Sequence, residues 1–78
     1  MSREATLEKI AELCRTVFED EKLEITKETA AKDVEAWDSL THIILISEIE
    51  NAFGIKFTLD EIQKARNVGE LVSIIEGK

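Results

Sequence analysis

Proline and tyrosine are absent from this 78-residue sequence, and glycine occurs only three times. Such a chain lacks the turn residues that punctuate a β-sandwich. A single cysteine cannot form an internal disulfide, so nothing favours a secreted protein. No apolar run approaches the roughly 20 residues that span a bilayer, and the first residues lack the apolar core of a signal peptide. We therefore expect a soluble, cytoplasmic protein.

Positive charge is also scarce, because ten Lys and Arg residues face 17 Asp and Glu residues and the formal net charge is −7. Nucleic acids and anionic membranes are therefore poor partners, and basic protein surfaces are better ones. The sequence is rich in helix formers, and 44% of its residues are hydrophobic. Length and composition together predict one all-α domain that covers residues 1–78.

Hydrophobic periodicity predicts a four-helix bundle with three main helices, one short third helix and a long first loop. The predicted helices cover residues 3–19, 39–53, 59–65 and 68–76. Residues 20–37 lose the helical period and form the loop, which can include one helical turn. We expect three apolar side chains to pin this loop onto the helices: Leu23, Ile25 and Val34.

Local signals mark where three of these helices begin and where one ends. Asp38, Thr58 and Asn67 each stand where an N-cap residue is expected, and Glu61 completes a capping box with Thr58. Gly54 is suited to the left-handed stop that follows the helix at 39–53.

The helix at 39–53 has more apolar surface than its own core requires. At about 100° per residue, one side collects the residues predicted to face the core: His42, Leu45, Ile46, Ile49, Ala52 and Phe53. Nearly opposite lie Leu40, Ile44 and Ser47, with Ile43 at the margin. Contiguous exposed apolar side chains at a helix N-terminus indicate a docking patch. The alternative is singly scattered apolar residues, which are common on protein surfaces.

Ser39 falls at the first position of this helix, directly after the predicted cap, Asp38. We expect its hydroxyl to point outward at the positive end of the helix dipole, where several free backbone N–H groups can receive a phosphate. Taken on residue types alone, an Asp-Ser pair before an apolar helix is most often only a helix cap.

In this setting, Asp38-Ser39-Leu40 resembles the signature of acyl and peptidyl carrier proteins, the phosphopantetheine-binding family. The similarity covers nearly the whole chain, including the acidic balance, the long first loop and the Phe53-Gly54-Ile55 end of the second helix. The resemblance implies an acyl-carrier-like bundle in which 4′-phosphopantetheine from coenzyme A is esterified to Ser39. The thiol of that arm then holds acyl or aminoacyl groups as thioesters, and the carrier itself is no enzyme. Asp38 would cap the helix and help to position the modifying enzyme's metal and coenzyme.

The resemblance also implies partners: a phosphopantetheinyl transferase, an acyl- or aminoacyl-loading ligase, and downstream transferases or synthases. They would dock on a monomeric carrier through Leu40, Ile43, Ile44, Ser47 and Trp37. The stretch from Trp37 to Ile43 looks more like stand-alone carriers of specialised lipid, polyketide or aminoacyl pathways than like the fatty-acid-synthesis carrier. Thr41 and Ile44 stand where that carrier typically has acidic residues, and Ala36 replaces its usual glycine.

Three further residues have alternative interpretations. Trp37 packs at the junction of loop and helix, covers the end of the loop, or belongs to the partner surface. His42 suits a core histidine near Trp37, with a switch, base or gating role as the alternative, and no convergent ligands predict a metal site around it. Cys14 lies on the apolar face of the first helix and is predicted to be buried.

Two other function classes compete with a carrier. One is a non-covalent, acidic helical module that binds a partner helix through the patch on the helix at 39–53. The other is a stand-alone enzyme, which is disfavoured because the sequence offers no plausible pair of nucleophile and base.

Overall fold

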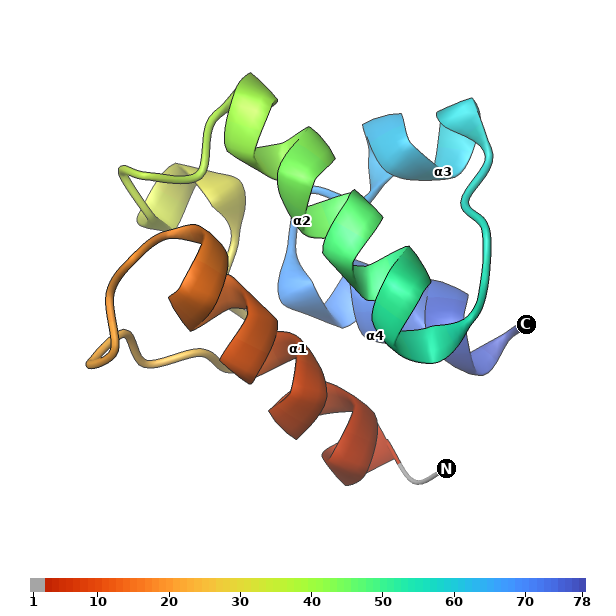
Figure 1. The fold of residues 1–78 in the computed structure, drawn as a ribbon, viewed down its shortest axis with the longest axis horizontal. Coiled ribbons are helices and arrows are strands. Elements are labelled where there is room, and N and C mark those ends of the chain that lie inside the picture. Colours follow the sequence, from red (N-terminus) through yellow and green to blue (C-terminus); the bar gives the residue numbers. More distant parts are fainter. Residues whose placement is uncertain (1–2) are drawn as a thin grey trace.

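The computed structural model describes residues 3–78, which form the predicted all-α bundle (Figure 1). Its helices are α1 (Arg3–Val17), α2 (Ser39–Phe53), α3 (Leu59–Lys64) and α4 (Val68–Glu76), with a 3₁₀ turn, η1 (Ala31–Asp33), in the first loop. Helix α1 packs against both α2 and α4, and the short α3 lies beyond α2 on the far side from α1. Within residues 3–78, each helix is too short or too polar to cross a membrane.

Helix α1 ends two residues before the predicted position. The Phe18 N–H still donates to the Cys14 carbonyl, 2.8 Å away, but Glu19 then adopts a left-handed conformation with φ 54°. The next N–H, from Asp20, reaches back to the Arg15 carbonyl at 3.0 Å, which closes the helix end. A left-handed residue at this point is usually glycine or asparagine, so a glutamate gave no sequence signal for the stop.

Helix α2 buries most of the predicted face. His42, Leu45, Ile46 and Ile49 are buried as expected, whereas Phe53 is only half-buried and Ala52 is exposed. The prediction for Ala52 is wrong. Ala52 lies on nearly the same side of the helix as the fully buried Leu45, but it is in the last turn of α2, where Phe53 is also only half-buried. Gly54 ends the helix with φ 66°, as predicted.

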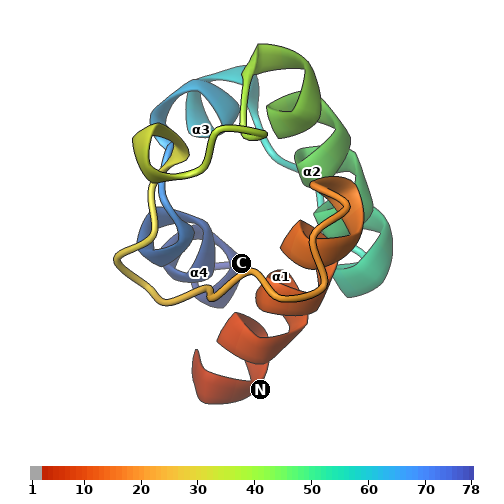
Figure 2. The ribbon, with the colours of Figure 1, turned by 90° about the vertical axis from the view of Figure 1, so that its left-hand side faces the viewer.

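The first loop is anchored by side chains and by backbone hydrogen bonds. Val34 is buried, and Leu23 and Ile25 pack half-buried against the core, which confirms the predicted apolar pins. In addition, two loop carbonyls accept the first N–H groups of α4: Thr29 from Val68 and Lys27 from Gly69, both at 2.8 Å. Figure 2 shows the loop running beside the start of α4.

These backbone bonds explain why Gly69 has no side chain. A Cβ atom at this position would lie 2.8 Å from the Lys27 carbonyl oxygen, a backbone atom that cannot move away without breaking the loop's attachment to α4. We expect Gly69→Ala to lower the free energy of unfolding by about 1–3 kcal/mol, measured by urea denaturation. Gly77→Ala is the matched control, because its nearest backbone atom would be 3.4 Å away. Equal stability of the two variants would contradict this account.

Candidate functional site

Asp38 caps α2, as predicted. Its Oδ1 atom accepts hydrogen bonds from the backbone N–H groups of Leu40 at 3.0 Å and Thr41 at 2.9 Å. The bond from the Thr41 N–H, with smaller contributions from the Thr41 hydroxyl and the Leu40 N–H, lowers the pKa of the Asp38 carboxyl below its usual value. The cap is therefore a charged carboxylate at neutral pH.

Ser39 is exposed and is the first residue of α2. Among the described residues, none makes a hydrogen bond with its hydroxyl, because the capping bonds are made by Asp38. The hydroxyl is thus free to react, at the positive end of a 15-residue helix dipole.

The prediction of several free backbone N–H groups around Ser39 is wrong. Asp38 takes the N–H groups of Leu40 and Thr41 through its side chain, and that of His42 through its carbonyl at 2.9 Å. A phosphate on Ser39 would therefore gain from the helix dipole rather than from a set of unpaired donors.

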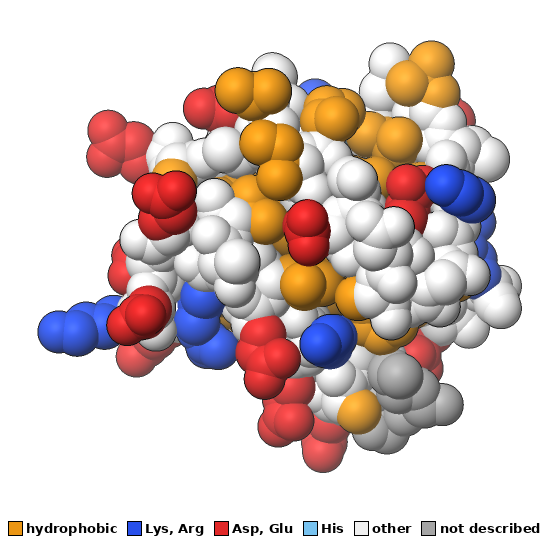
Figure 3. All heavy atoms as spheres, viewed as in Figure 1, with side chains coloured by type: hydrophobic (Ala, Val, Ile, Leu, Met, Phe, Trp, Pro, Cys, Tyr) orange, Lys and Arg blue, Asp and Glu red, His pale blue; other side chains and the backbone are white. Residues whose placement is uncertain are grey.

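An apolar surface lies directly beside Ser39. Leu40 is 71% exposed, Ile43 54% and Ile44 42%, and Ser47 one turn further on is also exposed. Figure 3 shows apolar side chains gathered along the edge of the molecule where α2 and α3 lie. The predicted face assignment of these residues is correct. Leu59, at the start of α3, is also 70% exposed, but it lies on another helix and is not part of the group on α2.

Trp37, two residues before Ser39, is buried with an exposed fraction of 4%. Its ring packs against Phe18 at the end of α1, with ring centroids 5.5 Å apart, and stacks on His42 at 6.0 Å. Of the three interpretations from the sequence, packing at the junction of loop and helix is the one that the structure shows. A side chain this deeply buried offers no exposed area to a partner.

His42 is also buried, and it connects Trp37 to α3. The Trp37 Nε1–H donates to His42 Nδ1 at 2.9 Å, and His42 Nε2 lies 2.8 Å from the carbonyl oxygen of Ile62. An indole N–H can only donate, so Nδ1 is the acceptor and Nε2–H donates to Ile62. The prediction of a core histidine near Trp37 is confirmed.

Helix α3 ends near this contact, since the Arg66 N–H donates to Lys64 instead of reaching back to Ile62. The Ile62 carbonyl thus lacks the usual helical partner, and His42 supplies one from another helix.

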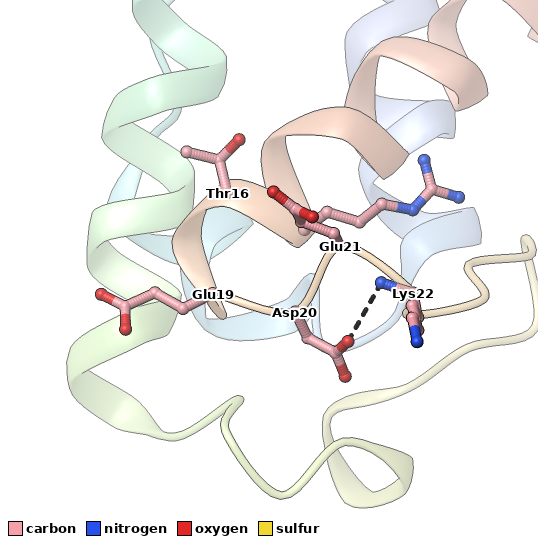
Figure 4. A pocket seen from close by; sticks show the side chains of 6 residues that line it. Thr16, Glu19, Asp20, Glu21 and Lys22 are labelled. Atoms are coloured by element: carbon pink, nitrogen blue, oxygen red, sulfur yellow. Dashed lines mark hydrogen bonds between the residues drawn. The ribbon is translucent and has the colours of Figure 1, made fainter.

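A surface hollow lies elsewhere, where α1 runs into the loop (Figure 4). It is lined by Arg15, Thr16, Glu19, Asp20, Glu21 and Lys22, and one of its walls is held by a hydrogen bond from the Lys22 N–H to Asp20 Oδ1 at 3.1 Å. No lining residue comes from the start of α2. Within residues 3–78, no group of three His, Cys, Asp or Glu side chains is placed to hold a metal ion.

Comparison with known proteins agrees with this geometry. The family model described as the phosphopantetheine attachment site matches residues 8–75. An acyl carrier protein from Streptococcus pyogenes serotype M3 is 39% identical over 74 residues, which cover 95% of this chain and 96% of that relative. Another from Thermotoga maritima is 30% identical over 77 residues, with 99% and 95% covered. The solution structure of a holo acyl carrier protein from Geobacter metallireducens has a TM-score of 0.86 at 44% identity, covering 94% of this chain and 84% of that one.

These matches define a carrier domain with a covalently attached 4′-phosphopantetheine group. The chain belongs to the acyl carrier protein family. Proteins of this family tether acyl intermediates, act as carriers rather than catalysts, and interact with phosphopantetheinyl transferases and biosynthetic enzymes. The residues at the start of α2 fit the prosthetic group, because they offer a free, exposed hydroxyl at a positive helix end.

Counting reactive thiols tests the assignment as a carrier with a thiol-bearing prosthetic group. The chain's own cysteine, Cys14, is fully buried, and burial raises the pKa of its thiol to about 12. Since only the thiolate reacts readily, we expect the folded apo protein to show no reactive thiol toward an aromatic disulfide reagent at neutral pH. The same protein in denaturant should show one thiol per chain, and the folded holo protein should show one from its prosthetic group. Rapid labelling of folded apo protein would mean that Cys14 is accessible.

Proposed function

We propose that Ser39 is the attachment residue for 4′-phosphopantetheine. The observation that carries this proposal is the exposed Ser39 hydroxyl, which is free of hydrogen bonds because Asp38 performs the capping. In the modification, Ser39 Oγ attacks the phosphorus of coenzyme A that bears the pantetheine. The new Oγ–P bond replaces the P–O bond to the second phosphate, adenosine 3′,5′-bisphosphate leaves, and a base on the transferase takes the serine proton. The resulting phosphodiester anion lies at the positive end of α2.

Asp38 has a second role in this proposal. Both capping bonds use its Oδ1 atom, so Oδ2 is left to interact with the metal ion and coenzyme of the transferase. The lowered pKa of Asp38 supports this role, because the carboxylate stays negatively charged and can bind a cation.

We further propose that partners bind the apolar surface formed by Leu40, Ile43, Ile44 and Ser47. Trp37 is omitted from this surface because its side chain is buried. The partners in question are an acyl- or aminoacyl-loading ligase and downstream transferases or synthases of a specialised lipid, polyketide or aminoacyl pathway. Residues 1–78 act as one monomeric carrier domain in the cytoplasm, in keeping with a net charge of −7 that favours solubility.

Intact-mass measurement tests the attachment residue. Purified apo protein is incubated with coenzyme A and a broad-specificity phosphopantetheinyl transferase, and it should gain the mass of one phosphopantetheinyl group. Ser39→Ala should gain nothing, whereas Ser73→Ala, which removes an exposed hydroxyl on α4, outside the proposed partner surface, should gain the group normally. The proposal fails if wild-type protein gains no mass or if Ser39→Ala is still modified. The first of these results is the one that a non-covalent interaction module would give.

A further inference from the structure

The Thr41 hydroxyl ties the start of α2 to the end of the first loop. Its Oγ1 atom accepts a hydrogen bond from the Asp38 N–H at 2.8 Å and lies 2.7 Å from the carbonyl oxygen of Ala36, to which it donates. Two other oxygens, both on Asp38, lie further from Oγ1 at 3.3 Å. One hydroxyl therefore bridges the backbone on both sides of Trp37.

The segment that Thr41 holds is also fixed from inside the molecule. The Trp37 N–H donates to the Val34 carbonyl at 3.0 Å, and the indole of Trp37 is held by His42 at 2.9 Å. The inner side of the turn therefore depends on Trp37, and its solvent side depends on Thr41. Ser39 follows this turn directly, so the turn sets the direction from which the chain enters the modification site.

A single hydroxyl makes both of these bonds because one oxygen atom both accepts and donates. A glutamate at the same helix position can accept from the capping residue's N–H, but a carboxylate cannot donate to a carbonyl. A valine has the shape of threonine and makes neither bond, whereas a serine retains the hydroxyl. The residue type at position 41 is therefore matched to two backbone groups at once.

We propose that Thr41 is a positioning residue for the modification of Ser39, acting through the Ala36–Asp38 turn. This inference rests on the proposed attachment at Ser39. The transferase has to bind Asp38, Ser39 and the exposed side chains of α2 together, and a turn that is already ordered spares the ordering cost on binding. Without the Thr41 hydroxyl, the Ala36–Asp38 turn spends part of its time in other conformations. The apparent affinity of the carrier for the transferase then falls in proportion to the fraction of molecules that keep the turn seen in the structure.

Steady-state kinetics of the transferase, with the apo carrier as the varied substrate, test this role. We expect Thr41→Val to raise the KM for the carrier about tenfold, equal to about 1.4 kcal/mol, while kcat stays within about twofold because the bound carrier is ordered again. Thr41→Ser should restore the wild-type KM. Thr16→Val is the matched control, because it removes a hydroxyl that bonds the Glu12 carbonyl on α1, away from Ser39, and it should leave both constants unchanged.

A measurement on the wild-type protein complements the variants. The Asp38 amide should be protected from hydrogen exchange, because its N–H is bound to Thr41 Oγ1. The inference is overturned if this amide exchanges as fast as in an unstructured peptide, if Thr41→Val has the wild-type KM, or if Thr16→Val raises KM equally. Modification of wild-type protein in the same assay separates these results from a failure of the proposed function, in which the wild-type protein itself takes up no group.

Discussion

Replacing His42 by leucine is expected to lower the free energy of unfolding by about 2–5 kcal/mol. The reason is that the buried indole N–H of Trp37 and the part-buried carbonyl of Ile62 lose their hydrogen-bond partner at once. Loss of a buried partner costs about 1–3 kcal/mol, and loss of a part-buried one lies toward the lower end of that range. For a domain of this length, whose total stability is on the order of 4–12 kcal/mol, this is a large fraction. Urea denaturation followed by circular dichroism measures it.

A double-mutant cycle with Trp37→Phe sharpens the test. The phenylalanine removes the indole N–H, so His42→Leu should cost less in that background, and the difference is the coupling energy of the pair. If the free-energy costs of the two single variants simply add up to the cost of the double variant, the hydrogen bond between Trp37 and His42 contributes nothing to stability.

The loss should be concentrated at α3. Helix α3 has only six residues and is marginal on its own, and His42 supplies the partner for one of its last carbonyls. In the His42→Leu protein, exchange at the Ile62 and Ala65 amides should accelerate more than at Phe18, which closes α1. Equal acceleration at all three amides would indicate global unfolding and would contradict a local role for His42.

Changing both Leu40 and Ile44 to aspartate is expected to reduce kcat/KM for partner enzymes by roughly a hundredfold or more, because two apolar contacts of a docking surface are lost together. Both side chains are exposed, so the free energy of unfolding should change by less than about 0.5 kcal/mol. Kinetics of the transferase and of a loading enzyme measure the first effect, and thermal melting measures the second.

Leu59→Asp is the matched control for this pair, since Leu59 is equally exposed but lies on α3, outside the proposed partner surface. It should reduce kcat/KM much less than the double variant does. Because the proposed contacts are apolar, the loss should also persist as ionic strength rises. Unfolding of the double variant would show instead that these residues support the core.

The features that the sequence predicted correctly are those that a local pattern encodes. The caps at Asp38, Thr58 and Asn67 each use a side chain to bind a backbone N–H two or three residues ahead, and such contacts leave a mark in a short window of sequence. The stop at Gly54 and the exposed face of α2 follow from backbone freedom and helical period in the same way.

The features that it missed depend on distant or backbone contacts. His42 and Ile62 are 20 residues apart, and the bonds between the loop and α4 join main-chain atoms, so residue types carry almost no trace of them beyond the glycine at position 69. The wrong prediction of free N–H groups at Ser39 shows a different limit of prediction from sequence. A dipole argument counts the donors of a helix end, but only the structure shows how many of them the cap has already used.

The attachment of the loop to α4 has a consequence for synthesis of the protein. The carbonyls of Lys27 and Thr29 are bound by N–H groups near position 68, about forty residues later in the chain. A nascent chain that has only reached α2 already contains Ser39, but its first loop still lacks the segment that orders it. The attachment of the loop to α4 can therefore form only after α4 has been synthesised, whereas the turn before Ser39 is bound by Thr41 and His42, which follow it closely in the chain.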